Sequence, residues 1–137
     1  MNITRVAALG IFAFMVAGCA STKQFAPRPD ESAITPGKAQ IRVYRPGQLW
    51  GTANAFKVSD GTNVVGHLGP KGELLWERDA GEMSLSASPT ILSMGGFNVE
   101  EAQLESGKRY EYEAWFPFFY PFSHHGLERT AVTPLGQ

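Results

Sequence analysis

Residues 109–116 read Arg-Tyr-Glu-Tyr-Glu-Ala-Trp-Phe, and the alternation in this stretch decides the class of fold. From Tyr110 to Phe116 every second residue is aromatic or apolar, whereas Arg109, Glu111 and Glu113 stand between them. Successive side chains of an extended strand point to opposite faces, so this pattern predicts a strand with one buried face and one solvated face.

The same period of two recurs along the chain between short turn signals such as Asp60-Gly61 and Ser106-Gly107. No segment shows a helical period over three turns. Regular spacing of short alternating runs is typical of sandwiches and barrels. We therefore predict an all-β fold, a single antiparallel β-sandwich of about seven short strands, at residues 39–45, 55–59, 64–68, 73–77, 83–87, 97–104 and 109–116.

Residues 1–18 have the three parts of a secretory signal. Arg5 supplies a positive charge, residues 6–16 are apolar, and the small residues Ala17 and Gly18 precede Cys19. About 15 apolar residues in a helix reach only ~22 Å, less than the ~30 Å hydrocarbon core of a bilayer. We therefore expect a cleaved signal peptide at 1–18 rather than a transmembrane anchor.

The stretch that follows Cys19 has no periodic pattern and contains Pro27, Pro29 and Pro36. This composition predicts a flexible tether over residues 19–37, with a reach of up to ~60 Å when fully extended. The sandwich domain is then expected to occupy residues 38–137.

Charge and cysteine content exclude several classes of protein. The chain has 12 Lys and Arg against 13 Asp and Glu, and the basic residues are scattered. A nucleic-acid partner is therefore not expected. Cys19 is the one cysteine of the sequence, so an intrachain disulfide is impossible and packing must stabilise the domain.

The residues Val16-Ala17-Gly18-Cys19 resemble the lipobox of bacterial lipoproteins. This resemblance implies lipidation of Cys19 and attachment to a membrane. Ala20 follows, where an Asp would imply retention at the inner membrane. The resemblance therefore implies the periplasmic side of the outer membrane if the host is Gram-negative.

A second resemblance covers residues 38–115. Arg42-Val43-Tyr44-Arg45-Pro46 resembles the opening "Y-x-Y-R-P" strand of a family of small bacterial lipoproteins of unknown function, with Arg42 in place of the first aromatic. Residues 65–68 (Val-Gly-His-Leu) resemble its "V-G-x-L" segment, and residues 104–112 its closing "L-x-x-G-K-x-Y-Y" segment. The family implies a fold and a location, but no reaction, substrate or catalytic residue.

An aromatic run at residues 115–122 contains six aromatic residues and two prolines. Prolines disfavour a central strand, so a loop is expected. The run either plugs one end of the core or forms an exposed patch that binds a protein or a bilayer interface. For a protein partner we predict contacts at Trp50, Phe118, Phe119 and Tyr120.

The alternative is a glycan-binding or peptidoglycan-binding module, in which Trp50 and Tyr44 stack on sugar rings. A metal site is not expected, since the adjacent His124 and His125 would point in opposite directions on an extended chain and His67 is distant in sequence.

Catalysis is also not expected. The carboxylates Glu100, Glu101, Glu111 and Glu113 fit a solvated strand face better than an acid–base pair. Neither a nucleophile elbow nor a phosphate-binding loop is present in the sequence. The sequence therefore predicts a lipid-anchored, non-enzymatic binding or scaffold module of the cell envelope, without a cofactor.

Overall fold

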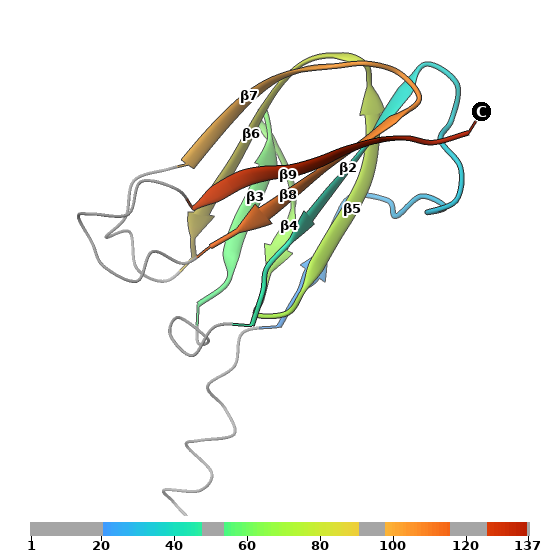
Figure 1. Cartoon of the computed structure of the whole chain (residues 1–137). Helices are drawn as coiled ribbons and strands as arrows, with labels where there is room; N and C mark the ends of the chain where they lie inside the picture. The colour runs from blue at the N-terminus through green and yellow to red at the C-terminus, as the bar shows by residue number, and fades with distance from the viewer. Residues whose placement is uncertain (1–20, 48–53, 91–97, 116–125, 137) are drawn as a thin grey trace, which may run out of the picture.

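The computed structural model describes residues 21–47, 54–90, 98–115 and 126–136 (Figure 1). Within these ranges the chain forms strands and no helix. The strands are β1 (Lys23–Gln24), β2 (Lys38–Tyr44), β3 (Phe56–Asp60), β4 (Asn63–Leu68), β5 (Glu73–Asp79), β6 (Gly81–Pro89), β7 (Asn98–Leu104), β8 (Lys108–Ala114) and β9 (Leu127–Pro134).

The strands form two sheets packed face to face. One sheet has the order β1-β4-β3-β6-β7 and the other β5-β2-β8-β9, so the predicted all-β sandwich is confirmed. All strand pairs are antiparallel except β2–β8, which is parallel. β2 and β8 are not consecutive in the chain, because β3 to β7 lie between them, so no hairpin forces an antiparallel pairing.

The period of two places the core between the sheets. In β8, Tyr110, Tyr112 and Ala114 are buried, whereas Glu111 and Glu113 are only partly covered. In β2, Ile41 and Val43 are fully buried and lie in the same cluster. Burying an aliphatic side chain of this size contributes roughly 1.5–3 kcal/mol relative to leaving it in water.

The end of the sandwich at which β2, β4, β6 and β8 finish, at the lower left in Figure 1, is called the lower end here. Arg45 follows β2 at this end and is 1% exposed. Its guanidinium donates to the carbonyl oxygens of Asn54 (2.5 Å) and Leu68 (3.2 Å) and lies over the ring of Phe56. Burial lowers the pKa of this guanidinium. Arg45 thereby joins the end of β2 to the beginning of β3 and the end of β4.

The prediction of a flexible tether at 19–37 is wrong for residues 21–37, which pack on the domain. Lys23 and Gln24 pair with β4, and Ile34 is buried. The carboxamide of Gln24 donates to the carbonyl of Leu75 (2.7 Å) and accepts from its N–H (3.2 Å). β5 is an edge strand whose outward backbone groups need partners, and the amide of Gln24 supplies both a donor and an acceptor.

β9 is the second strand that the pattern does not predict. Leu127 is its one buried residue, because β9 lies at the edge of the four-stranded sheet and pairs only with β8. A strand that is exposed on both faces shows no alternation of apolar and polar residues in its sequence. The other predicted strands match β2–β8 to within a few residues at their ends.

Gly66 provides a test of the packing of residues 21–37. A Cβ at Gly66 would lie 2.5 Å from the carbonyl oxygen of Lys23, so Gly66→Ala must push β1 away from β4. We expect faster amide exchange at Phe25 and Ala26, whose N–H groups donate to Val65, together with a lower melting temperature. Gly136→Ala is the control, since nothing lies within 4 Å of its Cβ position. Unchanged exchange in Gly66→Ala would contradict this packing.

Candidate functional site

The residues that the sequence predicts as functional lie outside the described ranges. These are Cys19, Trp50, Phe118, Phe119 and Tyr120. The strands that flank the last four of these residues do come together: β2 and β8 end, and β3 and β9 begin, at the lower end of the sandwich (Figure 1). The N–H of Trp115 donates to the carbonyl of Gly126 (2.7 Å).

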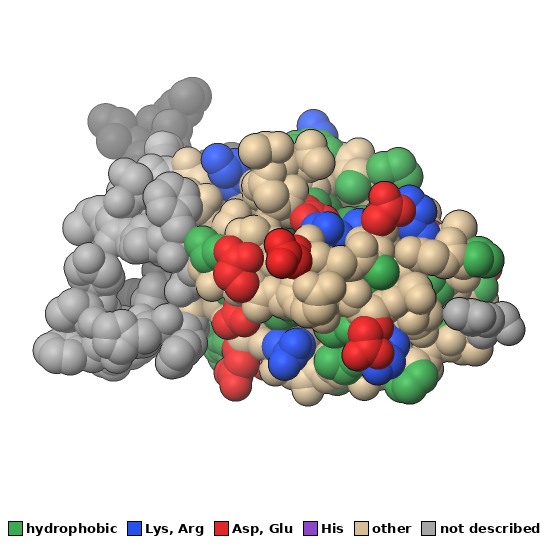
Figure 2. Space-filling view, turned by 90° about the horizontal axis from the view of Figure 1, so that it is seen from above, with side chains coloured by type: hydrophobic (Ala, Val, Ile, Leu, Met, Phe, Trp, Pro, Cys, Tyr) green, Lys and Arg blue, Asp and Glu red, His purple; other side chains and the backbone are tan. Residues whose placement is uncertain are grey.

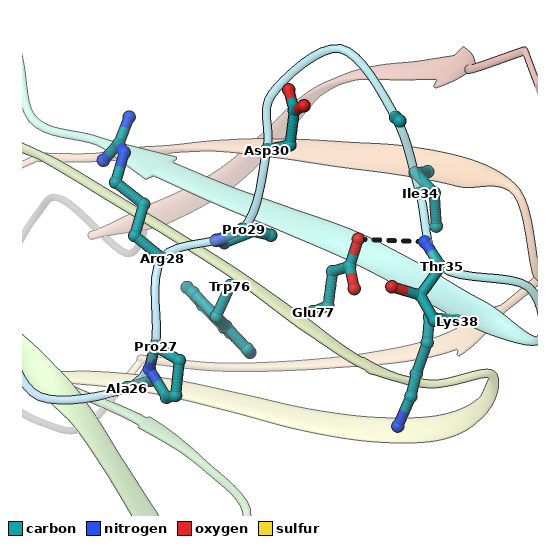
Figure 3. A pocket seen from close by; sticks show the side chains of 11 residues that line it. Ala26, Pro27, Arg28, Pro29, Asp30, Ile34, Thr35, Lys38, Trp76 and Glu77 are labelled. Carbon is teal, nitrogen blue, oxygen red and sulfur yellow. Dashed lines mark hydrogen bonds between the residues drawn. The ribbon is translucent and has the colours of Figure 1, made fainter.

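A groove that the sequence pattern does not predict runs along the edge of β5 that pairs with no other strand (Figure 3). We call it the β5 groove. Its volume is about 570 Å³, and it lies between β5 and the N-terminal segment 26–35. The lining residues are Ala26, Pro27, Arg28, Pro29, Asp30, Ala33, Ile34, Thr35, Lys38, Trp76 and Glu77.

Gln40 and Arg109 hold the wall of the β5 groove in place. Gln40 is fully buried and donates to the carbonyl oxygens of Asp30 (2.8 Å) and Ala33 (3.3 Å). Arg109 donates to the side-chain oxygen of Gln40 (2.8 Å) and to the carbonyl of Glu31. These bonds cover the outer face of β2, which the alternating pattern alone predicts to be in solvent.

Trp76 and Glu77 form the β5 side of the groove. Trp76 is 3% exposed, and its indole N–H donates to Asp60 (3.1 Å). The Glu77 carboxylate accepts from the N–H of Thr35 (3.1 Å), the bond drawn in Figure 3. In an antiparallel ladder, backbone groups two residues apart point to the same side. The N–H and carbonyl of Glu77 therefore point outward like those of Leu75.

An ionic cluster attaches the N-terminal segment beside the groove. Arg28 lies 2.7 Å from a carboxylate oxygen of Glu73, and Arg42 contacts Glu73 and Glu111. Burial alone would raise the pKa of Glu73, but hydrogen bonds from Arg28 and Arg42 outweigh it and lower this pKa below its usual range. In the view of Figure 2, acidic and basic side chains lie next to one another over much of the surface.

A smaller hollow of about 300 Å³ lies on the outer face of the four-stranded sheet, at the end of β2. Tyr44 is 38% exposed there. Its neighbours in the hollow are Arg42, Glu111, Tyr112, Glu113 and Thr130. An exposed aromatic ring beside carboxylates and a guanidinium is a combination suited to sugar hydroxyls and ring faces.

The described residues hold no group of three or more His, Cys, Asp and Glu side chains positioned for a metal ion. The ring of His67 packs edge-to-face on Phe25, with 5.1 Å between ring centroids. Glu111 is held by Arg42 at 3.3 Å. His124 and His125 lie outside the described ranges.

Among the residues that the structure describes there is no helix with the length and apolarity needed to cross a membrane. Comparison with models of protein families, with curated proteins and with solved structures finds no match to this chain.

Glu73 predicts a pH dependence of stability. Because its pKa is lower in the folded state, the carboxylate stabilises the fold above its unfolded pKa of about 4.3. This contribution is lost as the pH falls through the folded pKa. We expect the unfolding free energy, measured in urea, to fall less between pH 6 and about pH 3 in Glu73→Gln than in the unaltered protein. Glu82→Gln, at an exposed carboxylate, is the control. Equal losses in all three proteins would contradict this role of Glu73.

Proposed function

We propose that this chain is a cell-envelope lipoprotein, held on a membrane through lipid on Cys19, whose sandwich is a non-enzymatic binding module for a protein partner. The signal pattern of residues 1–18 and the lipobox-like residues 16–19 support the anchor. Ala20 favours the periplasmic side of the outer membrane in a Gram-negative host.

The observation that carries the binding role is the β5 groove. It combines a Trp76 floor, proline-containing walls and the outward backbone of an edge strand. An extended peptide can add to such an edge through main-chain hydrogen bonds while its side chains enter the adjacent groove. An extended segment of a protein partner is therefore the proposed ligand.

Trp50, Phe118, Phe119 and Tyr120 remain proposed contacts for the same partner. The described strands that flank these residues in the chain, β2 and β8 before them and β3 and β9 after them, end or begin at the lower end (Figure 1). Tryptophan and tyrosine are enriched among residues that dominate binding energy.

The second candidate is a glycan-binding module, which the Tyr44 hollow favours. Trp50 would add a further stacking surface to Tyr44. Retention of the protein on peptidoglycan sacculi separates this function from binding of a protein partner.

The anchor is tested by Cys19→Ala. We expect the unaltered chain to incorporate labelled fatty acid and to fractionate with membranes, because several acyl chains hold a protein on a bilayer almost permanently. The variant should lose both properties while keeping the same melting temperature. Incorporation of label by Cys19→Ala would show that the acyl chains are attached elsewhere.

The peptide-binding role is tested by in-cell photocrosslinking from Ala33, an exposed residue of the β5 groove. We expect a discrete protein adduct from position 33 and none from position 106, an exposed turn residue outside the groove. Thr35→Arg, which fills the groove from its rim, should reduce the adduct severalfold. An adduct from position 120 alone would move the binding surface to the lower end. No protein adduct, with retention on sacculi, would support the glycan alternative.

A further inference from the structure

Two lysines and a histidine lie side by side on the outer face of the five-stranded sheet. In the antiparallel register His67 of β4 is opposite both Lys23 of β1 and Lys57 of β3. Residues directly opposite each other share a face of the sheet. Lys57 alternates with the buried Phe56 and Val58, so this row points away from the core.

Phe25 adds an apolar ring to the row. It is 46% exposed, packs on His67, and has the Lys23 ammonium 5.6 Å from its ring centroid. We call Lys23, Phe25, Lys57 and His67 the Phe25 patch. An exposed aromatic ring flanked by lysines is the combination found at membrane interfaces, where the ring enters the headgroup region and the ammonium groups stay in water.

The lysines in the Phe25 patch differ from other lysines of the domain in their ion pairing. Lys38 and Lys108 form ion pairs with Asp79 and Glu105. In contrast, no carboxylate among the described residues lies within ion-pair distance of Lys23, Lys57 or Lys71. Lys71 is an exposed residue in the turn between β4 and β5.

The short stretch of chain between Cys19 and Thr22 would keep the Phe25 patch close to the membrane. The hydroxyl of Thr22 accepts from the N–H of Gly69 (2.9 Å), and a Cβ at Gly72 would lie only 1.7 Å from that hydroxyl. The chain is therefore fixed to the domain from Thr22 onward. Cys19 is three residues earlier, and three extended residues span about 10 Å. Lipid on Cys19 would hold Thr22 within about that distance of the bilayer surface.

We infer that the Phe25 patch is the surface by which the domain lies on the bilayer that holds Cys19, with Lys23 and Lys57 facing anionic headgroups and Phe25 in the interface. This inference rests on the proposed lipid anchor. The opposite sheet presents Glu111, Glu113 and Glu128 on its outer face, and anionic lipid would repel these carboxylates. On the five-stranded sheet the exposed Glu82 and Glu101 lie on β6 and β7, and not on the strands that carry the Phe25 patch. The orientation turns the Tyr44 hollow away from the membrane.

The test uses the full lipidated protein, purified from membranes and reconstituted into vesicles of phosphatidylglycerol and phosphatidylethanolamine. Acylation blocks the thiol of Cys19, so a spin label can be attached at Phe25→Cys. We expect this label to be accessible to oxygen and shielded from a water-soluble nickel relaxant. Val132→Cys on β9, a position of similar exposure at 42%, is the control and should show the reverse. Lys57→Cys is a second probe in the patch, should Phe25→Cys disturb the fold.

Charge variants test the role of the lysines. Each lysine near an anionic surface should change the ratio of docked to undocked domain about fivefold. Lys23→Gln with Lys57→Gln should therefore lower this ratio roughly 25-fold, whereas Lys108→Gln should leave it unchanged.

If the protein is acylated but the labels at positions 25 and 57 have the same accessibility to oxygen and nickel as the label at 132, the inference is wrong. The proposed lipoprotein function would still stand. Mass spectrometry that finds no acyl chains on Cys19 would instead remove the proposed anchor, and the inference with it.

Discussion

The buried guanidinium of Arg45 is the interaction on which the lower end of the sandwich depends. A buried charge is costly unless polar groups surround it, and here the carbonyl oxygens of Asn54 and Leu68 accept from it. The side-chain oxygen of Asn54 in turn accepts from the N–H and hydroxyl of Thr90, just after β6. One hydrogen-bonded chain thus joins the ends of β2, β4 and β6 to the beginning of β3. The connections that carry Trp50 and residues 91–97 start from this chain of bonds.

The N-terminal segment 21–37 is the second constraint, because both proposed binding surfaces depend on it. Its hydrogen bonds from Gln40 and Arg109 form the wall of the β5 groove. Its first residues supply Lys23 and Phe25 to the Phe25 patch. The same segment satisfies the edge of β5 through Gln24, which protects that edge from pairing with other chains at Leu75 but leaves Glu77 available.

Lys23 and Lys57 give one part of the five-stranded sheet a local positive charge, since no carboxylate among the described residues lies within ion-pair distance of them. The exposed Glu82 and Glu101 lie on the same outer face at β6 and β7, and the outer face of the four-stranded sheet carries both glutamates and arginines. A domain fixed close to a membrane gains a preferred orientation from such a local charge. A partner would then meet the β5 groove at the edge between these faces.

The sequence by itself determined the fold class and most strands, because period-two alternation in β2 and β8 depends only on local geometry. It also placed turns where Gly and Asp occur, as at Asp60-Gly61. Only the tertiary structure decided that the side chain of Gln24 hydrogen-bonds to the backbone of β5 and that β2 and β8 run parallel. It also decided that Lys23, His67 and Lys57 are neighbours. These facts depend on the order of strands in each sheet, and pairing between distant residues leaves no periodic signal in either partner. The β5 groove was missed for the same reason, since prolines at 27 and 29 predict a loop whether or not a strand edge is nearby to bind it.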